Sequence, residues 1–151
     1  FNLKMLIEHL NKKVGHLMGQ KHLENHLDLD DVYVEADSEK IMTVVTNLYS
    51  NAIRYTPDGS DIYVTLKRYE DKVRFEIENT GIFIPESEIN RIWEPFYRLE
   101  KSRNRDSGGT GLGLLITSKI LKMHHSEYGV MNTSRGVKFY FELNIDPDFD
   151  E

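Results

Sequence analysis

The sequence predicts one α/β domain, a two-layer sandwich in which about three helices pack on a mixed, largely antiparallel sheet. Two patterns carry the prediction: apolar residues at helical spacing in some segments, and regular apolar–polar alternation in others. The 151 residues are enough for one hydrophobic core. No repeat or linker-like stretch divides the chain, so we expect a single folded unit over residues 23–145.

Three main helices are expected from the apolar spacing. The first occupies residues 1–20, and the third occupies residues 112–123. The second begins after Asp37, whose carboxylate can cap its first turn, and ends at the turn of residues 56–59. A fourth, shorter helix is expected over residues 85–93, because proline is favoured at the first helical position.

Strands are expected where apolar and polar residues alternate or where short apolar runs are bounded by turn residues. These segments are residues 24–29, 32–36, 62–66, 73–77, 127–132 and 137–143. Asp71 and Lys72 lie between the runs 62–66 and 73–77, so we expect these two strands to form a hairpin. We expect the last two segments to form a second hairpin.

Composition excludes several classes of function. The formal charge of −6 argues against nucleic-acid binding, which needs a basic face. There is no cysteine, and therefore no disulfide or thiolate metal site. No apolar run approaches the roughly 20 residues that cross a bilayer, so we expect no direct membrane contact by this domain. The chain starts at Phe1 and not at methionine, so we expect a segment of a longer protein, with a frayed acidic tail at residues 146–151.

Residues 47–55 place three polar side chains on one helical stripe. At about 100° per residue, Asn47, Asn51 and Arg54 fall beside the apolar face of the predicted helix. An amide oxygen suits Mg²⁺, which prefers oxygen ligands, and a guanidinium one turn later can hold phosphate oxygens. The alternative interpretation is a helix with an ordinary polar face.

Two further stretches combine polar residues with glycine. Residues 78–85 place Asn79 near a glycine at a strand end, where an amide can face a flat base, although such pairs also occur in simple turns. Residues 107–114 are glycine-rich and lead into a helix, so their backbone N–H groups can meet an anion. They lack the Gly-Lys-Ser/Thr ending of a Walker loop. A flexible loop before a helix is the alternative.

In this order and spacing, the stretches resemble the motifs of the bacterial sensor histidine kinases, over about residues 37–143. The asparagine box corresponds to residues 47–55, the first glycine box to 78–85, the phenylalanine box to 93–98, the second glycine box to 107–114, and the remains of the third to 134–136. The resemblance implies the Bergerat-type ATP-binding fold, shared with type II topoisomerases, mismatch-repair ATPases and heat-shock chaperones.

The resemblance also implies ATP and Mg²⁺ as cofactors and assigns roles to residues. Asn51 would hold Mg²⁺, Arg54 and Lys101 would act with it in catalysis, and Asn79 would face the adenine. The residues implied to contact the cofactors are Asn47, Asn51, Arg54, Tyr55, Asn79, Gly81, Phe83, Ile84, Tyr97, Arg98, Lys101, Arg103, Gly109, Thr110, Gly111, Leu112 and Gly113.

The implied activity is that of a protein-histidine kinase. Hydrolysing relatives place a glutamate at the position of Asn47 as the base for water, and an amide cannot take that proton. The acceptor histidine would lie on a separate dimerisation domain, whose last helix residues 1–22 would continue. The phosphoryl group would then pass to a response-regulator aspartate. The domain would be cytoplasmic, in a full-length kinase anchored to the membrane.

Two residues of the first glycine box depart from the family pattern. Asn79 stands where the family has aspartate, and Phe83 stands where it has a second glycine. Phe83 would be strained if its backbone needed a positive φ. In the third box, Ser134 replaces a glycine and Val137 lies near a usual threonine. These departures leave open a nucleotide-binding-impaired pseudokinase that acts as a docking module. An ATP hydrolase of the same fold and a glycine-rich scaffold without a nucleotide also stay open.

Overall fold

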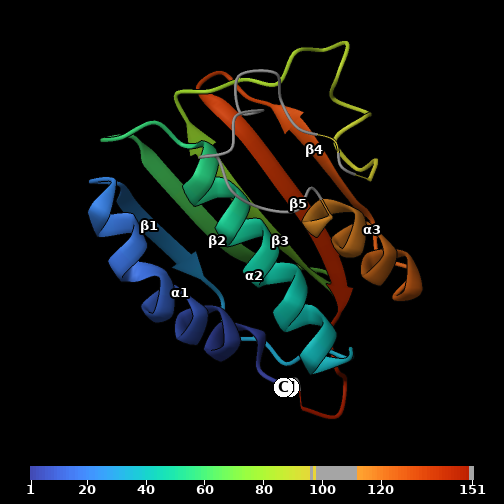
Figure 1. Cartoon of the computed structure of the whole chain (residues 1–151). Helices are drawn as coiled ribbons and strands as arrows, with labels where there is room; N and C mark the ends of the chain where they lie inside the picture. Colours follow the sequence, from blue (N-terminus) through green and yellow to red (C-terminus); the bar gives the residue numbers. More distant parts are fainter. Residues whose placement is uncertain (96, 98–111, 150–151) are drawn as a thin grey trace.

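The computed structural model describes residues 1–95, 97 and 112–149. Over these residues three helices cover one face of a five-stranded sheet (Figure 1). The elements are α1 (Leu3–Gln20), β1 (Glu24–Leu29), α2 (Ser38–Tyr55), β2 (Asp61–Tyr69), β3 (Lys72–Thr80), α3 (Gly113–Met123), β4 (Tyr128–Asn132) and β5 (Gly136–Asn144). The predicted two-layer α/β sandwich is confirmed.

The sheet is mixed, with the strand order β1-β2-β3-β5-β4. Its first two strands are parallel and joined through α2, whereas the other neighbours are antiparallel, as predicted. At the end of β3, Asn79 lies opposite Ile62 of β2 and Val137 of β5. The next residue, Thr80, lies opposite Gly136. This register sets the neighbours of Asn79, one of the predicted site residues.

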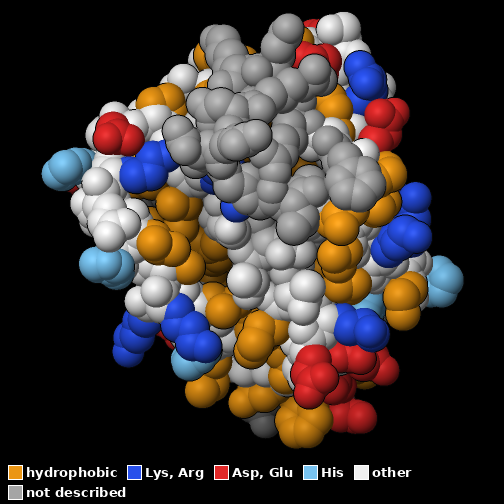
Figure 2. Space-filling model, in the orientation of Figure 1, with side chains coloured by type: hydrophobic (Ala, Val, Ile, Leu, Met, Phe, Trp, Pro, Cys, Tyr) orange, Lys and Arg blue, Asp and Glu red, His pale blue; other side chains and the backbone are white. Residues whose placement is uncertain are grey.

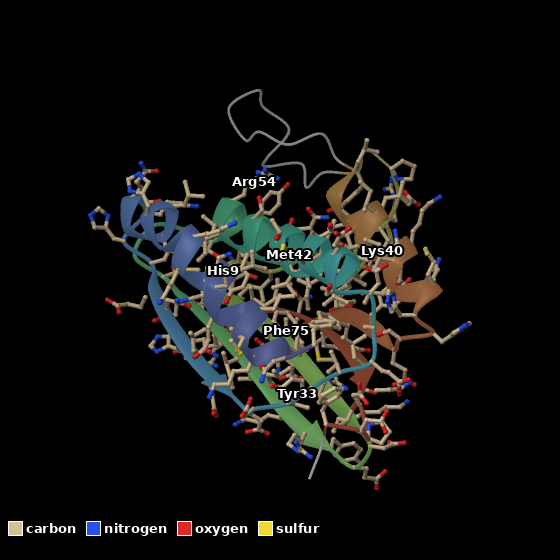
Figure 3. All side chains as sticks on the ribbon, turned by 90° about the horizontal axis from the view of Figure 1, so that it is seen from below. His9, Tyr33, Lys40, Met42, Arg54 and Phe75 are labelled. Carbon is tan, nitrogen blue, oxygen red and sulfur yellow. The ribbon has the colours of Figure 1, made fainter. Side chains whose placement is uncertain are left out.

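The core lies between the helices and the sheet. The alternating residues of β2, β3 and β5 point into it, and Phe75 of β3 stacks on Phe141 of β5 with 4.9 Å between ring centroids. Figure 3 shows Phe75 between the two layers. Leu3, Ile7 and Leu10 of α1 belong to the same cluster of buried residues as the side chains of α2 and the sheet. The first helix, in residues 1–22, thus shares one hydrophobic core with the unit predicted over residues 23–145. No described helix has the length and hydropathy that a membrane span requires.

A polar contact inside this core joins α1, α2 and β1. The Tyr49 side chain of α2 is fully buried, and its hydroxyl donates to Asn11 Oδ1 of α1 at 3.2 Å. The same oxygen accepts from Asn25 Nδ2 of β1 at 2.7 Å. Burial raises the pKa of Tyr49, so the phenol stays protonated and keeps donating at physiological pH. The contact ties three elements together at one point.

Two predicted elements differ in the structure. Residues 32–36 alternate in burial like a strand, but they form only two isolated bridges, from Tyr33 to Asn2 and from Val34 to Ile145. The reason is that this segment crosses the end of the sheet instead of joining it. Residues 85–93 are a series of turns and not a helix, because the N–H groups of Glu88, Arg91 and Glu94 each bond the carbonyl three residues earlier.

The sheet face opposite the helices holds an ion-pair network behind Asn79. The Glu78 carboxylate accepts from Arg135 at 2.8 Å and from the Thr133 hydroxyl at 2.6 Å. Burial by itself would raise the pKa of Glu78, but these hydrogen bonds and the charges of Arg135 and Lys138 outweigh it and hold the pKa below its ordinary value. The network fastens the β4–β5 turn to the end of β3.

A lowered pKa makes the contribution of Glu78 depend on pH. The carboxylate stabilises the fold above the pKa that Glu78 has in the unfolded chain, about 4.3, and this stabilisation is lost as the pH falls through the lower folded pKa. We therefore expect Glu78→Gln to lower the free energy of unfolding at pH 7 by about 1–3 kcal/mol. The deficit should shrink as the pH falls below about 4, because the unfolded wild-type chain then takes up a proton at Glu78, and it should vanish below the lowered folded pKa.

Urea unfolding of wild type and variant at pH 7 and pH 3 measures both effects. Glu127→Gln is the matched control, because Glu127 is exposed and its carboxylate has no partner among the described residues. An equal deficit at the two pH values would show that Glu78 acts through packing and not through its charge.

Candidate functional site

The polar stripe lies on α2, and its position follows from the way this helix packs. Asp37 caps the helix, since its carboxylate accepts from the N–H groups of Glu39 at 3.1 Å and Lys40 at 3.2 Å. The apolar positions from Ile41 to Ile53 then face the sheet. This orientation leaves Asn47 and Asn51 half-buried and Arg54 exposed. The three predicted residues therefore lie at the rim of the core.

Asn47 joins α2 to the beginning of α3. Its amide nitrogen donates to the carbonyl of Gly113 at 3.2 Å and to the Thr117 hydroxyl at 3.4 Å. A Cβ at Gly113 would lie 3.7 Å from the Asn47 Cγ, so the Asn47 side chain packs directly against the Gly113 backbone. Residues 66 positions apart thus meet, and the first turn of α3 is held against the polar stripe.

Asn51 and Arg54 lie one and two turns further along the same stripe. Neither side chain has a hydrogen-bond or ion-pair partner within the described parts of the chain, which leaves an amide and a guanidinium available to a ligand. Tyr55, which is half-buried, follows in the last turn. Figure 3 shows Arg54 on the helix layer, away from the sheet.

Lys21 fixes that last turn and was missed from the sequence. Its ammonium group donates to the carbonyls of Ile53 at 2.6 Å and Arg54 at 3.2 Å, as cations do at helix C-termini. Burial lowers the pKa of Lys21, although the charge of Asp58 opposes this. The contact joins residues 32 and 33 positions apart, so no local motif could have indicated it.

The end of β3 supplies a second part of the site. Asn79 is 4% exposed and lies on the helix-facing side of the sheet, in line with Phe75 and Ile77. The chain then turns at Gly81, whose φ of +84° favours glycine. A Cβ there would lie 3.0 Å from Ser60 Oγ and 3.2 Å from Pro57 Cγ. The exits of β3 and α2 are therefore in contact.

The predicted site residues after Gly81 differ in how far their side chains are buried. Ile84 is buried, and its backbone is bracketed by Asn132, which donates to the Ile84 carbonyl at 2.8 Å and accepts from its N–H at 2.9 Å. Phe83 is 52% exposed and its φ is not positive, so the anticipated backbone strain is absent there. Tyr97 is half-buried and donates to the Glu88 carboxylate at 2.6 Å.

The beginning of α3 is the third part of the site. Leu112 is at the N-cap position and makes no side-chain cap hydrogen bond, and Gly113 is the first helical residue. A helix N-terminus of this kind attracts anions. The remaining predicted site residues lie outside the described part of the chain, namely Arg98, Lys101, Arg103, Gly109, Thr110 and Gly111.

Charge is distributed unevenly over the helix-bearing surface. Figure 2 shows acidic side chains gathered at the lower right, over the N-terminal end of α2. The polar stripe lies toward the other end of the same helix, which ends with Arg54 and Tyr55. The described residues hold no group of three or more His, Asp or Glu side chains that would bind a metal by themselves.

Fold and site together define a class of protein: an α/β sandwich in which the amides of Asn51 and Asn79 and the Arg54 guanidinium have no partner among the described residues, and in which a helix N-terminus packs against the same helix α2. Such groups suit a phosphate-bearing nucleotide. The sequence model described as "Histidine kinase-, DNA gyrase B-, and HSP90-like ATPase" matches residues 36–147. This chain belongs to that family, and it is accordingly an ATP-binding domain.

Relatives of known name support the assignment. The adaptive-response sensory kinase SasA of Nostoc sp. is 40% identical over 122 residues, which is 80% of this chain and 29% of SasA. The nucleotide-free catalytic domain of the histidine kinase ThkA superposes with a TM-score of 0.86 at 32% identity, covering 98% of this chain and 95% of that one. ThkA in complex with the response regulator TrrA superposes with a TM-score of 0.81 at 29% identity, covering 99% and 42%. The chain spans 18% of the length of the sensor histidine kinase WalK of Bacillus subtilis and 32% of that of RppB of Synechocystis sp..

Proposed function

We propose that this chain is the catalytic domain of a sensor histidine kinase and that Mg²⁺-ATP binds across α2, the end of β3 and the beginning of α3. The observation that supports this most is the polar stripe of α2, where Asn47 holds the first turn of α3 while Asn51 and Arg54 have no partner among the described residues. Unpaired polar groups at the rim of a core are what a polyanionic ligand requires.

The residues of the stripe fit a magnesium nucleotide. Asn51 offers one neutral amide oxygen, and Mg²⁺ takes few protein ligands because it keeps waters and phosphate oxygens. Arg54, in the last turn of the helix, would bind phosphate oxygens, and Asn79 would meet the base. The ion would neutralise phosphate charge during transfer. Lys101, Arg103 and the glycines of residues 107–113 remain proposed contacts.

Phosphoryl transfer to a protein is favoured over hydrolysis. Asn47 occupies the position where hydrolysing relatives have a glutamate that acts as the general base for water. Its amide nitrogen donates to the Gly113 carbonyl. An amide cannot take a proton from water. The proposed acceptor is a histidine on a dimerisation domain, which α1 would follow in the longer protein. That protein would be anchored to the membrane through other segments, with this domain in the cytoplasm.

A response regulator is the proposed downstream partner. The support is the ThkA–TrrA complex, whose kinase shares this fold over 99% of the present chain. The regulator would receive the phosphoryl group from the histidine. The chain spans only 22% of the length of the SilS sensor kinase and 29% of SasA, so this partnership is proposed for the longer protein.

Calorimetric titration with ADP and with a non-hydrolysable ATP analogue, with and without Mg²⁺, tests the proposal. We expect one site per chain and tighter binding with Mg²⁺. No binding by a protein shown to be folded would contradict the proposal and leave a docking module. Steady ATP hydrolysis by the chain alone that disappears in Asn51→Ala would instead indicate a hydrolase.

A further inference from the structure

The Asn79 amide differs from the other buried polar side chains of the described core. Thr56, Glu78, Thr117 and Ser118 are buried too, and each makes a side-chain hydrogen bond. Asn79 is 4% exposed, and its amide bonds no described residue. Buried polar groups are normally paired, and an amide with no partner in the described part of the chain is available to a ligand at this place.

The surroundings of Asn79 leave its amide free to turn over. Its neighbours across the sheet are Ile62 of β2 and Val137 of β5, and neither side chain can donate or accept a hydrogen bond. Among the described residues, Asn25 Oδ1 is the only side-chain oxygen or nitrogen that is shut off from solvent and has no hydrogen-bond partner. The Asn79 amide, which also has no described partner, therefore keeps some contact with solvent. No described group fixes which amide atom is the oxygen.

An amide that can turn over matches two purine edges. Adenine presents a donor at its 6-amino group and an acceptor at N1, which pair with Oδ1 and Nδ2 of asparagine. Hypoxanthine and guanine present the reverse, an acceptor at O6 and a donor at N1. A rotation of the amide by 180° exchanges Oδ1 and Nδ2 and restores both hydrogen bonds. A carboxylate, which only accepts when ionised, matches just one of the two groups on either base.

We propose that the base site of this domain accepts 6-oxopurine nucleotides as well as adenine nucleotides, with Asn79 reading both. This inference rests on the proposed function, since it requires that the nucleotide base meets the end of β3. Inosine nucleotides are the sharpest probe, because inosine differs from adenosine only at position 6 and in the proton on N1.

The experiment compares the dissociation constants of Mg²⁺-ADP and Mg²⁺-IDP for the wild-type chain by calorimetry. We expect the two constants to agree within about tenfold, because the amide makes two hydrogen bonds to either base. A site with a fixed amide would instead face IDP with two mismatched groups and would discriminate by more than about a hundredfold.

Asn79→Ala identifies the group that reads the base. It should weaken ADP and IDP by similar factors, within about threefold of each other, because it removes the same two hydrogen bonds from both. Asn144→Ala is the matched control, since Asn144 is exposed at the far end of β5 and should leave both constants unchanged. Circular dichroism and thermal unfolding verify that each variant is folded.

The outcomes separate this inference from the proposed function. Similar constants that weaken together in Asn79→Ala support it. ADP binding with IDP rejected more than about a hundredfold overturns the inference and leaves the kinase proposal intact. If the ADP and IDP dissociation constants are similar but do not change in Asn79→Ala, the inference is overturned as well, because another group then contacts the base. Binding of neither nucleotide by the folded chain overturns both proposals.

Discussion

Replacing Asn51 with alanine is expected to abolish Mg²⁺-dependent phosphotransfer and to leave the free energy of unfolding almost unchanged. If Asn51 binds Mg²⁺ as proposed, its loss should reduce the rate by more than about 100-fold, since even outer-shell partners of a metal contribute about 10–100-fold. The stability should change by less than about 0.5 kcal/mol, because the half-buried amide gives up no hydrogen bond to a described residue and alanine favours the helix.

The test uses the longer protein with its own histidine domain, and it follows phosphohistidine formation together with urea unfolding. Asn47→Ala is the matched control one turn earlier on the same helix. It removes the bonds to Gly113 and Thr117, so it should cost about 1 kcal/mol of stability and loosen α3 from α2. Full phosphotransfer by Asn51→Ala would overturn the assignment of Asn51.

Gly136→Ala is expected to have the largest effect on stability. A Cβ at this position would overlap the backbone carbonyl of Asn79 and would lie 2.8 Å from the Cα of Thr80. Backbone atoms of a central strand cannot move aside as a flexible side chain can, so β3 and β5 must separate locally. We expect a loss of at least about 2 kcal/mol, together with weaker nucleotide binding because Asn79 is displaced.

Thermal and urea unfolding measure the first effect, and ADP titration of the folded variant measures the second. Gly15→Ala is the control, since a Cβ on this residue of α1 meets nothing within 4 Å. There alanine should stabilise the fold by about 0.5–1 kcal/mol. Wild-type stability in Gly136→Ala would show that the strands adjust around the added methyl group.

Short-range sequence patterns predicted most of the fold. The alternation Ile62, Val64, Leu66 and the cap at Asp37 are local signals, and both elements formed where they were expected. Periodicity failed for residues 32–36, because alternation reports which side chains are buried and not whether a neighbouring strand is present. The helix predicted over residues 85–93 also failed, because a proline that can open a helix is equally favoured in a turn, and successive turns form here.

The helical stripe of the candidate site was predicted from the sequence, but its contacts were not. Helical spacing placed Asn47, Asn51 and Arg54 on one stripe, and the structure has them there. The donation from Asn47 to Gly113 and the capping of α2 by Lys21 link distant parts of the chain. Such contacts depend on how elements pack, and a single sequence carries no signal for them. The roles of the site residues in binding remain predictions.

The contact among Asn11, Tyr49 and Asn25 fastens α1 rigidly to the rest of the domain. Sliding α1 by one residue, about 1.5 Å along its axis, would strand the buried hydroxyl and both amides without partners. Slippage is therefore penalised, whereas tilting the whole domain with α1 breaks none of these bonds. A displacement of α1 would therefore move α2, with Asn51 and Arg54, as one rigid body. It would change the orientation of the whole domain and not the arrangement of residues inside it.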